Sequence, residues 1–207
     1  MSREEVMYST IRNCLLRSFS RDGFSFKENF VVSGVGKPDI VLAVDTGSSK
    51  IPDFEIWVVE VKKRNEAILN SLTQTLKYSL FAHRCHLAVR FGKQAEGFSN
   101  EDIFLAESFG IGLIEFRYNK VNIVNFSKKF SPISARVNEV MEKLDFIKCN
   151  ICGNYVNKNR IEKKYSVNLF AAWLAKGALD PRRIRYSKGN RRLVNVCEDC
   201  VRNLSYK

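Results

Sequence analysis

Four of the six cysteines form two Cys-x-x-Cys pairs, Cys149 with Cys152 and Cys197 with Cys200. Two thiolates at this spacing fold around one metal ion in a tight turn, and two such turns complete a tetrahedral shell of four sulfur ligands. The pattern predicts a structural zinc site that joins two distant segments, and a four-cysteine iron–sulfur cluster stays open as the alternative. Disulfides are less favoured, because the charged start MSREEV does not resemble a secretory signal.

The basic residues are concentrated in the same part of the chain. Residues 148–207 contain 14 Lys and Arg against 4 Asp and Glu, and they carry most of the formal net charge of +12. A polyanion releases condensed counterions when basic side chains replace them, so this distribution indicates nucleic acid as the partner. We expect phosphate contacts from Arg182, Arg183, Arg185, Arg191 and Arg192. The sequence thus predicts a small basic zinc-binding domain over residues 148–207, including a helix over 166–179.

Residues 1–147 have the hydrophobic periodicity of a mixed α/β domain. The pattern predicts a helix over 3–19, strands over 24–32, 38–45 and 54–62, a helix over 66–81 and a strand over 86–91. A helix over 100–109, a hairpin with strands over 111–117 and 121–126, and a closing helix over 134–146 follow. The buried stripe of the second helix is expected to contain Leu69, Leu72, Leu76 and Leu80.

Two acidic residues and a lysine are chemically unusual within this domain, because they lie in or beside apolar strands. Glu60 and Lys62 are two residues apart in Val58-Val59-Glu60-Val61-Lys62, so their side chains point to the same face. Asp39 begins the neighbouring strand, where its carboxylate could lie across from Glu60. Lys62 alone could be the partner that a buried carboxylate needs. Two converging carboxylates would instead bind Mg²⁺ or Mn²⁺ beside a lysine that acts on water, a constellation suited to phosphodiester hydrolysis.

This combination resembles the PD-(D/E)XK nuclease superfamily of restriction enzymes, Holliday-junction resolvases and RecB-type exonucleases. The matching residues are Asp39, preceded by a proline, and Glu60-Val61-Lys62, set in an αβββαβ order that spans residues 3–91. The resemblance implies a restriction-endonuclease-like core with a mixed sheet. It also implies that Asp39, Glu60 and the carbonyl of Val61 bind a catalytic Mg²⁺ or Mn²⁺, and that Lys62 acts on the attacking water.

Two further features extend the resemblance. Gln74 and Tyr78 lie four residues apart in the expected second helix, and they are similar to the glutamine-to-tyrosine motif of the RecB-like branch. They either face solvent or approach the substrate. Many members also carry an acidic residue on the first helix, for which Glu4 and Glu5 are both candidates. The iron–sulfur members of that branch place one cluster cysteine before the core, whereas the paired cysteines here all follow it, and this difference favours zinc.

Together these features predict a metal-dependent deoxyribonuclease, such as an endonuclease, whose zinc-stapled basic domain holds the DNA. Two alternatives stay open: a non-catalytic protein that binds DNA or RNA on a nuclease-like fold, and an RNA-directed zinc protein. The longest apolar runs are far shorter than the ~18 residues of a membrane span, so we expect a cytoplasmic protein that associates with nucleic acid and not with membranes. The sequence leaves open whether the protein is a homodimer, which DNA structure it prefers and whether it cuts internally or from ends.

Overall fold

The computed structural model describes residues 3–18, 23–28, 30–32, 34–45, 54–63, 67–93, 95–157, 163–166, 193–197 and 200. Contacts divide the chain into two compact units. The first consists of Met1–Gly47 and Phe54–Val140, and the second of Ser48–Asp53 and Met141–Lys207. This division falls within α4 (Ser134–Lys143), a few residues before the boundary that the sequence suggests at 147.

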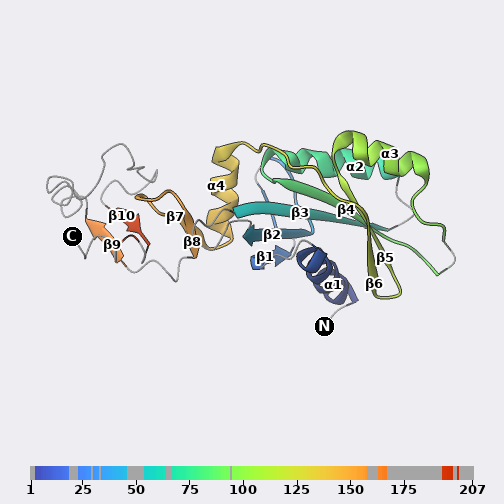
Figure 1. Cartoon of the computed structure of the whole chain (residues 1–207), viewed down its shortest axis with the longest axis horizontal. Coiled ribbons are helices and arrows are strands. Elements are labelled where there is room, and N and C mark those ends of the chain that lie inside the picture. The colour runs from blue at the N-terminus through green and yellow to red at the C-terminus, as the bar shows by residue number, and fades with distance from the viewer. Residues whose placement is uncertain are drawn as a thin grey trace. The chain divides into compact units, whose positions relative to one another are not determined.

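The first unit is built on a mixed sheet of six strands that follow one another in sequence order from β1 to β6 (Figure 1). Its first half is antiparallel, as expected for a hairpin-rich segment. This half contains β1 (Gly23–Glu28), β2 (Ile40–Asp45) and β3 (Phe54–Lys63). Because β3 is longer than β2, it extends past the residue at which β2 begins.

The second half of the sheet is mostly parallel. β3, β4 (Arg84–Arg90) and β5 (Gly112–Arg117) pair in parallel, and β6 (Lys120–Asn125) returns antiparallel to β5. Parallel strands run in one direction, so the carboxyl ends of β3, β4 and β5 lie at the same edge of the sheet. Ligand sites of open α/β sheets form at this kind of edge.

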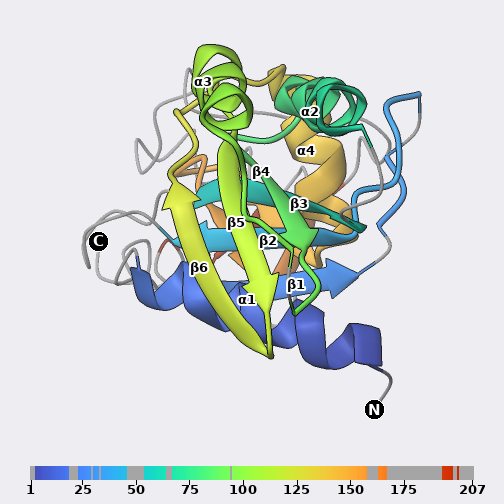
Figure 2. The same ribbon diagram turned by 90° about the vertical axis from the view of Figure 1, so that its right-hand side faces the viewer.

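Helices cover both faces of the sheet (Figure 2). α1 (Arg3–Ser18) crosses one face, while α2 (Ile68–Lys77) and α3 (Asn100–Phe109) lie on the other. α3 begins where the sequence predicts, because Ser99 and Asp102 form a reciprocal capping box at its first turn. The fold is therefore a mixed α/β sandwich with a helix layer on each side of one sheet.

Strand alternation decides which side chains meet which helix. Trp57 and Val59 of β3 pack in the core beneath α1, together with Ile11 and Leu15 of that helix. Successive side chains of a strand point to opposite faces, so the even-numbered residues near the end of β3, including Glu60, point toward α2. Both faces of β3 are therefore buried, and Glu60 points toward α2 rather than toward α1.

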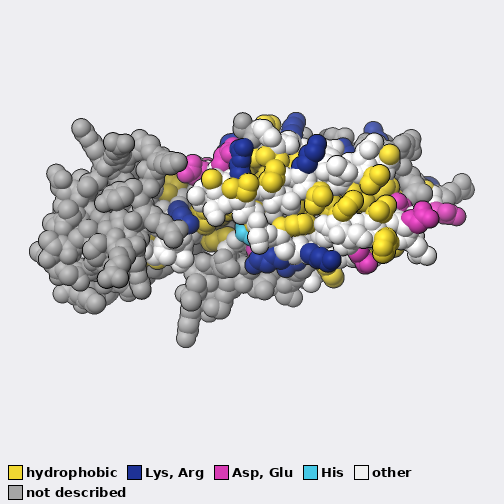
Figure 3. All heavy atoms as spheres, turned by 90° about the horizontal axis from the view of Figure 1, so that it is seen from above, with side chains coloured by type: hydrophobic (Ala, Val, Ile, Leu, Met, Phe, Trp, Pro, Cys, Tyr) yellow, Lys and Arg dark blue, Asp and Glu magenta, His cyan; other side chains and the backbone are white. Residues whose placement is uncertain are grey.

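The buried face of the second helix matches the leucine stripe that the sequence predicts only in part, since Leu72 and Leu76 pack in the core and the other two leucines do not. Leu69 and Leu80 are 52% and 45% exposed, whereas Ser71 and Thr75 are buried together with the first residue of η1 (Tyr78–Leu80). The two hydroxyls donate to main-chain carbonyls one turn earlier, at 3.3 and 2.8 Å, so these small residues can be buried and let the helix approach the sheet. From the side of α2 and α3, hydrophobic side chains are visible beside Lys and Arg (Figure 3).

The described residues of the second unit form two short antiparallel strand pairs. β7 (Phe146–Lys148) pairs with β8 (Tyr155–Asn157), and β9 (Lys163–Ser166) pairs with β10 (Leu193–Val196). β7 begins where the sequence predicts the end of the closing helix. The helix ends earlier because Asp145 adopts a left-handed conformation, with φ of 67°.

Some sequence predictions lie outside the described residues. These are the helix over 166–179, apart from its first residue, and the expected phosphate contacts of Arg182, Arg183, Arg185, Arg191 and Arg192. Within the ranges that the structure describes, no helix combines the length and the apolar character needed to cross a membrane.

Candidate active site and cysteine cluster

Asp39 lies just before β2, at the point where β3 extends beyond its neighbour. The antiparallel register of β2 and β3 continues to a position where Asp39 is opposite Glu60. The Asp39 carboxylate accepts a hydrogen bond from the main-chain N–H of Val61 at 2.7 Å and another from the hydroxyl of Tyr8 at 3.4 Å. Residues from α1 and β3 therefore meet at this half-buried carboxylate at the start of β2.

Glu60 is 3% exposed, and its carboxylate has three hydrogen-bond partners. Oε1 accepts from the Gln74 side-chain amide at 2.8 Å and from the Lys62 ammonium at 2.9 Å. Oε2 accepts from the Tyr78 hydroxyl at 2.8 Å, and the Gln74 amide also donates to that hydroxyl at 3.2 Å. The structure thus brings four of the predicted residues into one hydrogen-bonded cluster, which we call the Glu60 cluster, with Asp39 beside it.

The electrostatics of this cluster favour the retention of protons on its acids. Burial raises the pKa of Glu60 above its ordinary value of 4.5, the hydrogen bond from Lys62 lowers it, and the negative charge of Asp39 raises it again. Burial also raises the pKa of Tyr78, so its hydroxyl remains a donor. The ammonium of Lys62 lies 2.9 Å from Oε1 of Glu60, and the nearby charge of Asp39 opposes the ionisation of Glu60.

The donors of this site suit a divalent metal ion. Mg²⁺ and Mn²⁺ prefer carboxylate and carbonyl oxygens. A carboxylate offers about four acceptor positions, and hydrogen bonds from described residues occupy three of those of Glu60. Val61, the third expected ligand, contacts Asp39 through its main-chain N–H. A cation bound between Asp39 and Glu60 would offset their mutual repulsion.

Two residues of the site escaped sequence reasoning. Tyr8 lies on the apolar stripe of α1, three residues before Ile11, and therefore resembles a core residue. Gly36 packs against the ring of Tyr78, where a Cβ would lie 3.1 Å from a ring carbon. The Gly-Val-Gly segment before Asp39 was the available signal, since glycine permits close approach of a loop. The side chains of Glu4 and Glu5, in the first turn of α1, lie outside the described part of the structure.

The four paired cysteines converge within the second unit. Their sulfur atoms lie within 4.8 Å of one another, and the Cys149–Cys200 and Cys152–Cys197 sulfurs are each 3.9 Å apart. A tetrahedral shell with metal–sulfur distances of about 2.3 Å requires sulfurs about 3.8 Å apart. Hydrogen bonds from Cys152 and the other two thiols lower the pKa of Cys149, whereas the contact with Cys149 raises the pKa of Cys197 and of Cys200. The cluster could therefore hold a metal ion such as zinc.

Main-chain hydrogen bonds shape the turn that presents the first cysteine pair. Gly153 has φ of 80°, a conformation that favours glycine, and its N–H donates to the Cys149 carbonyl at 3.0 Å. The Cys149 N–H donates to the Asn154 carbonyl at 2.7 Å. Asn150 bonds both main-chain groups of Asn195, at 2.8 and 2.7 Å, and so joins this turn to the strand that leads into the second pair.

No protein-family model matches this chain, and no curated protein matches its sequence. Among solved structures, the chain is similar to a protein of unknown function from Silicibacter pomeroyi, at 22% sequence identity and a TM-score of 0.41. That match covers 62% of this chain and 75% of the other. What this protein does is therefore inferred from its own residues.

Proposed function

We propose that this chain is a PD-(D/E)XK-type nuclease that hydrolyses phosphodiester bonds in DNA with Mg²⁺ or Mn²⁺. The observation that carries the proposal is the Glu60 cluster, in which Lys62, Gln74 and Tyr78 all bond one buried carboxylate. The resemblance selects these residues from a strand and from a helix separated in sequence. Their meeting at one carboxylate, with Asp39 opposite, is what a shared catalytic role requires.

The order of elements supports the same proposal. α1, β1, β2, β3, α2 and β4 follow the αβββαβ order of the restriction-endonuclease-like core. Asp39 immediately precedes β2 and Glu60 lies on the adjacent β3, near the edge where the parallel strands end. Enzymes built on open α/β sheets carry their reacting groups at such edges.

Each residue of the site would have a separate role in hydrolysis. A bound Mg²⁺ or Mn²⁺ would supply Lewis-acid activation and lower the pKa of water. Asp39 and Glu60 would hold that ion through carboxylate oxygens. Lys62 would orient the attacking water, because its ammonium lies at the same carboxylate, 2.9 Å from Oε1. Gln74 and Tyr78 act as positioning residues, since both donate to Glu60 from the helix side.

Cleavage assays on the full-length protein test this function. Linear, circular and branched DNA would be incubated with Mg²⁺ or Mn²⁺ and with the Asp39→Asn, Glu60→Gln and Glu55→Gln variants. We expect cleavage by the wild type and by Glu55→Gln, the matched control in the same strand, and none by the other two. Full activity in Glu60→Gln would overturn the proposal, and DNA binding without cleavage by any protein would support the non-catalytic alternative.

The second unit completes the proposal as a zinc-stapled module that holds DNA through the basic residues of 148–207. The cysteine geometry supports zinc in a structural role, because four sulfurs fill a tetrahedral shell. Elemental analysis of the purified protein should find close to one zinc per chain, and Cys149→Ser should release it. Iron accompanied by a visible charge-transfer band would instead establish an iron–sulfur cluster.

A further inference from the structure

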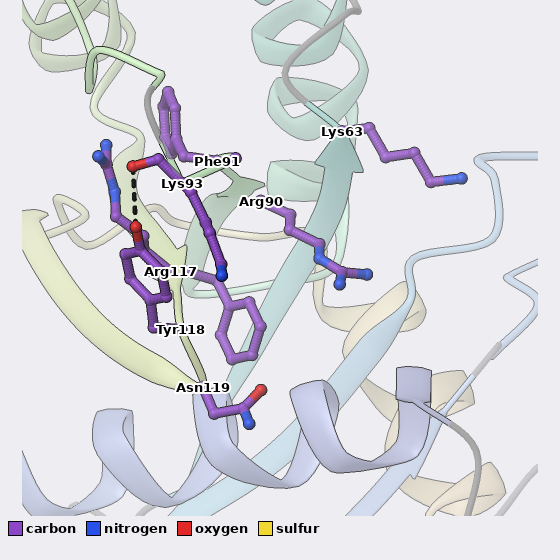
Figure 4. A pocket seen from close by; sticks show the side chains of 9 residues that line it. Lys63, Arg90, Phe91, Lys93, Arg117, Tyr118 and Asn119 are labelled. Carbon is purple, nitrogen blue, oxygen red and sulfur yellow. Dashed lines mark hydrogen bonds between the residues drawn. The ribbon is translucent and has the colours of Figure 1, made fainter.

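A hollow of about 420 Å³ lies in the first unit, where the parallel strands end (Figure 4). Its walls come from the ends of β3, β4 and β5, from the segment after β4 and from the β5–β6 turn. Lys63 and Arg90 extend on one side of the hollow, and Arg117 and Tyr118 lie on the other (Figure 4). We call this hollow the basic pocket.

The charge of the basic pocket is of one sign. Lys63, Arg90, Lys93 and Arg117 all line it, and none of its lining residues is acidic. The Arg117 guanidinium lies over the ring of Phe91, 5.4 Å from its centre, so that side chain is held in place. Four cations around one concavity create a potential that attracts phosphate groups.

The rim of the pocket carries an aromatic side chain on a strained turn. Tyr118 and Asn119 have φ values of 52° and 61°, a left-handed conformation that side chains other than Asn, Asp and Gly adopt rarely. Asn-Gly would suit this two-residue hairpin turn better, so the tyrosine is not explained by the turn alone. Its hydroxyl donates to the Lys93 carbonyl at 2.9 Å, while the residue stays 59% exposed. The ring is therefore fixed and accessible, as a stacking surface must be.

The basic pocket adjoins the Glu60 cluster. Lys62 belongs to the cluster and Lys63 to the pocket, and these neighbours point to opposite faces at the end of β3. Lys63 is paired with Arg90 across the parallel strands. A nucleic-acid chain that reaches Glu60 therefore needs to pass only around the carboxyl end of β3 to enter the pocket.

We propose that the basic pocket binds one nucleotide of a single-stranded segment of nucleic acid, with its phosphate among the cations and its base on Tyr118. The volume suits a nucleotide, and a duplex is too wide to enter a hollow of this size. Stacking on an aromatic ring beside cations is how proteins hold single strands without reading sequence. That this strand is the one being cut rests on the proposed nuclease function, whereas the binding itself does not.

Anisotropy measurements with a labelled single-stranded DNA test the cations in the full-length protein, in EDTA so that no cleavage occurs. The Arg90→Gln/Lys93→Gln double variant is compared with Arg17→Gln/Lys128→Gln, which removes the same charge from exposed positions outside the pocket. We expect the pocket variant to bind at least about tenfold more weakly than the control, with a salt slope reduced by about 0.7 per lost phosphate contact. Equal affinities would overturn the proposal.

Tyr118 provides a paired test of stacking. Tyr118→Phe keeps the ring, and Tyr118→Asn removes it while tolerating the left-handed backbone. We expect the Asn variant to bind about 5-fold to 150-fold more weakly than the wild type, the range for one stacked base. The Phe variant, which keeps the ring but loses the hydrogen bond to the Lys93 carbonyl, should lose less affinity than the Asn variant. A DNA strand containing 5-iodouracil should also form a photo-crosslink to Tyr118. Crosslinks confined to residues 148–207 would overturn the proposal.

Competition distinguishes a strand from a free nucleotide. Deoxyadenosine monophosphate should displace the labelled strand only at far higher concentration, and a blunt duplex should be insensitive to the Tyr118 variants. Displacement by the mononucleotide at equal concentration, or a duplex that loses affinity equally, would overturn the assignment to a single strand. Cleavage that survives in Glu60→Gln would remove the proposed function and leave these binding results unaffected.

Discussion

β3 buries two glutamates, one near each end, and the protein holds them in opposite ways. Glu55 and Glu60 are 4% and 3% exposed. Glu55 accepts hydrogen bonds from the Trp57 indole at 2.8 Å, from Arg84 at 3.0 Å and from Lys129 at 2.7 Å, so two cations face one carboxylate. Among the described residues, Glu60 accepts hydrogen bonds from one lysine, a neutral amide and a hydroxyl, and a second carboxylate lies nearby.

The pKa values of these two glutamates move in opposite directions. Burial raises the pKa of Glu55, but hydrogen bonds from Lys129 and Trp57 and the charge of Arg84 lower it overall. The pKa of Glu60 is raised, by burial and by Asp39. A buried carboxylate that two cations keep ionised stabilises the fold, whereas a buried carboxyl whose pKa is raised beside a second carboxylate is a candidate functional group. Equal burial in one strand thus accompanies a structural role at one end and a proposed catalytic role at the other.

Substitution of the lysine that bonds each glutamate should give the largest difference, which we expect in the rate of cleavage. Lys62→Met should lower the rate of Mg²⁺-dependent cleavage roughly 10²- to 10⁴-fold, because the attacking water loses its orienting group. Lys129→Met should leave the rate unchanged, and should cost less than about 1 kcal/mol of stability because exposed ion pairs contribute little. Single-turnover cleavage and urea unfolding measure the two effects. Comparable rate losses in both variants would break the comparison.

Substitution of each glutamate by glutamine should change the free energy of unfolding by different amounts. Glu55→Gln should lower the free energy of unfolding by about 2 kcal/mol, less than the roughly 3–5 kcal/mol for fully buried ion pairs because Lys129 is half exposed. Glu60→Gln should change it by less than about 1 kcal/mol, since its charge is poorly compensated. Urea titrations of both variants without added metal measure this difference. A larger loss in Glu60→Gln would assign the structural role to that end of the strand.

Metal addition should distinguish the same variants without any catalysis. Mg²⁺ at ten times its dissociation constant should stabilise the wild type by about 1.4 kcal/mol, since the ion binds only the folded state. Glu55→Gln should retain this gain, and Glu60→Gln should lose it. Thermal unfolding with and without Mg²⁺ provides the measurement. Equal stabilisation of both variants would place the metal elsewhere.

The smallest effect is expected in the pH dependence of stability. The lowered pKa of Glu55 contributes stability that is present above the ordinary value of 4.5 and is lost as the pH falls through the folded value. The raised pKa of Glu60 contributes stability that is present below 4.5 and is lost as the pH rises through its folded value. From acid to neutral pH, Glu55→Gln should therefore lose stability relative to the wild type and Glu60→Gln should gain. Parallel slopes for the two variants would contradict the assigned shifts.

The alternation of apolar and polar residues was sufficient to predict the elements up to β6. Boundaries and faces were harder, because hydrophobicity alone does not report internal hydrogen bonding. On any hydropathy scale Leu69 and Leu80 are better candidates for the core than Ser71 and Thr75. Ser71 and Thr75 are nevertheless the buried residues, because their hydroxyls donate hydrogen bonds to main-chain carbonyls one turn earlier. Whether Gln74 faces solvent depends on the rotation of α2 about its axis, which hydrophobicity does not fix. In the structure the Gln74 side chain donates to Glu60.

The site was readable from sequence where neighbouring residues of one strand carry it. Glu60 and Lys62 share a face by spacing alone, Asp39 was expected across from Glu60 at the start of the neighbouring strand, and the resemblance added Gln74 and Tyr78. Residues that meet only through tertiary structure gave no such signal. Arg90 and Arg117 come from separate strands, and they line one pocket because β4 and β5 run parallel. The two cations that hold Glu55 are likewise distant in sequence, so its role could not be foreseen.

The hydrogen bond from Val61 to Asp39 also bears on aggregation, because it occupies a main-chain N–H group that β2 does not pair. Main-chain pairing of β2 with β3 ends at Ile40, opposite Val59, and the N–H of Val61 is taken up by the Asp39 side chain beyond that point. Free N–H groups along a strand are templates on which another chain can add and start aggregation. Asp39→Ala would uncover such a group, whereas Asp39→Asn keeps a carbonyl that can accept from it. Selection for solubility and selection for the proposed metal binding would then act on the same residue.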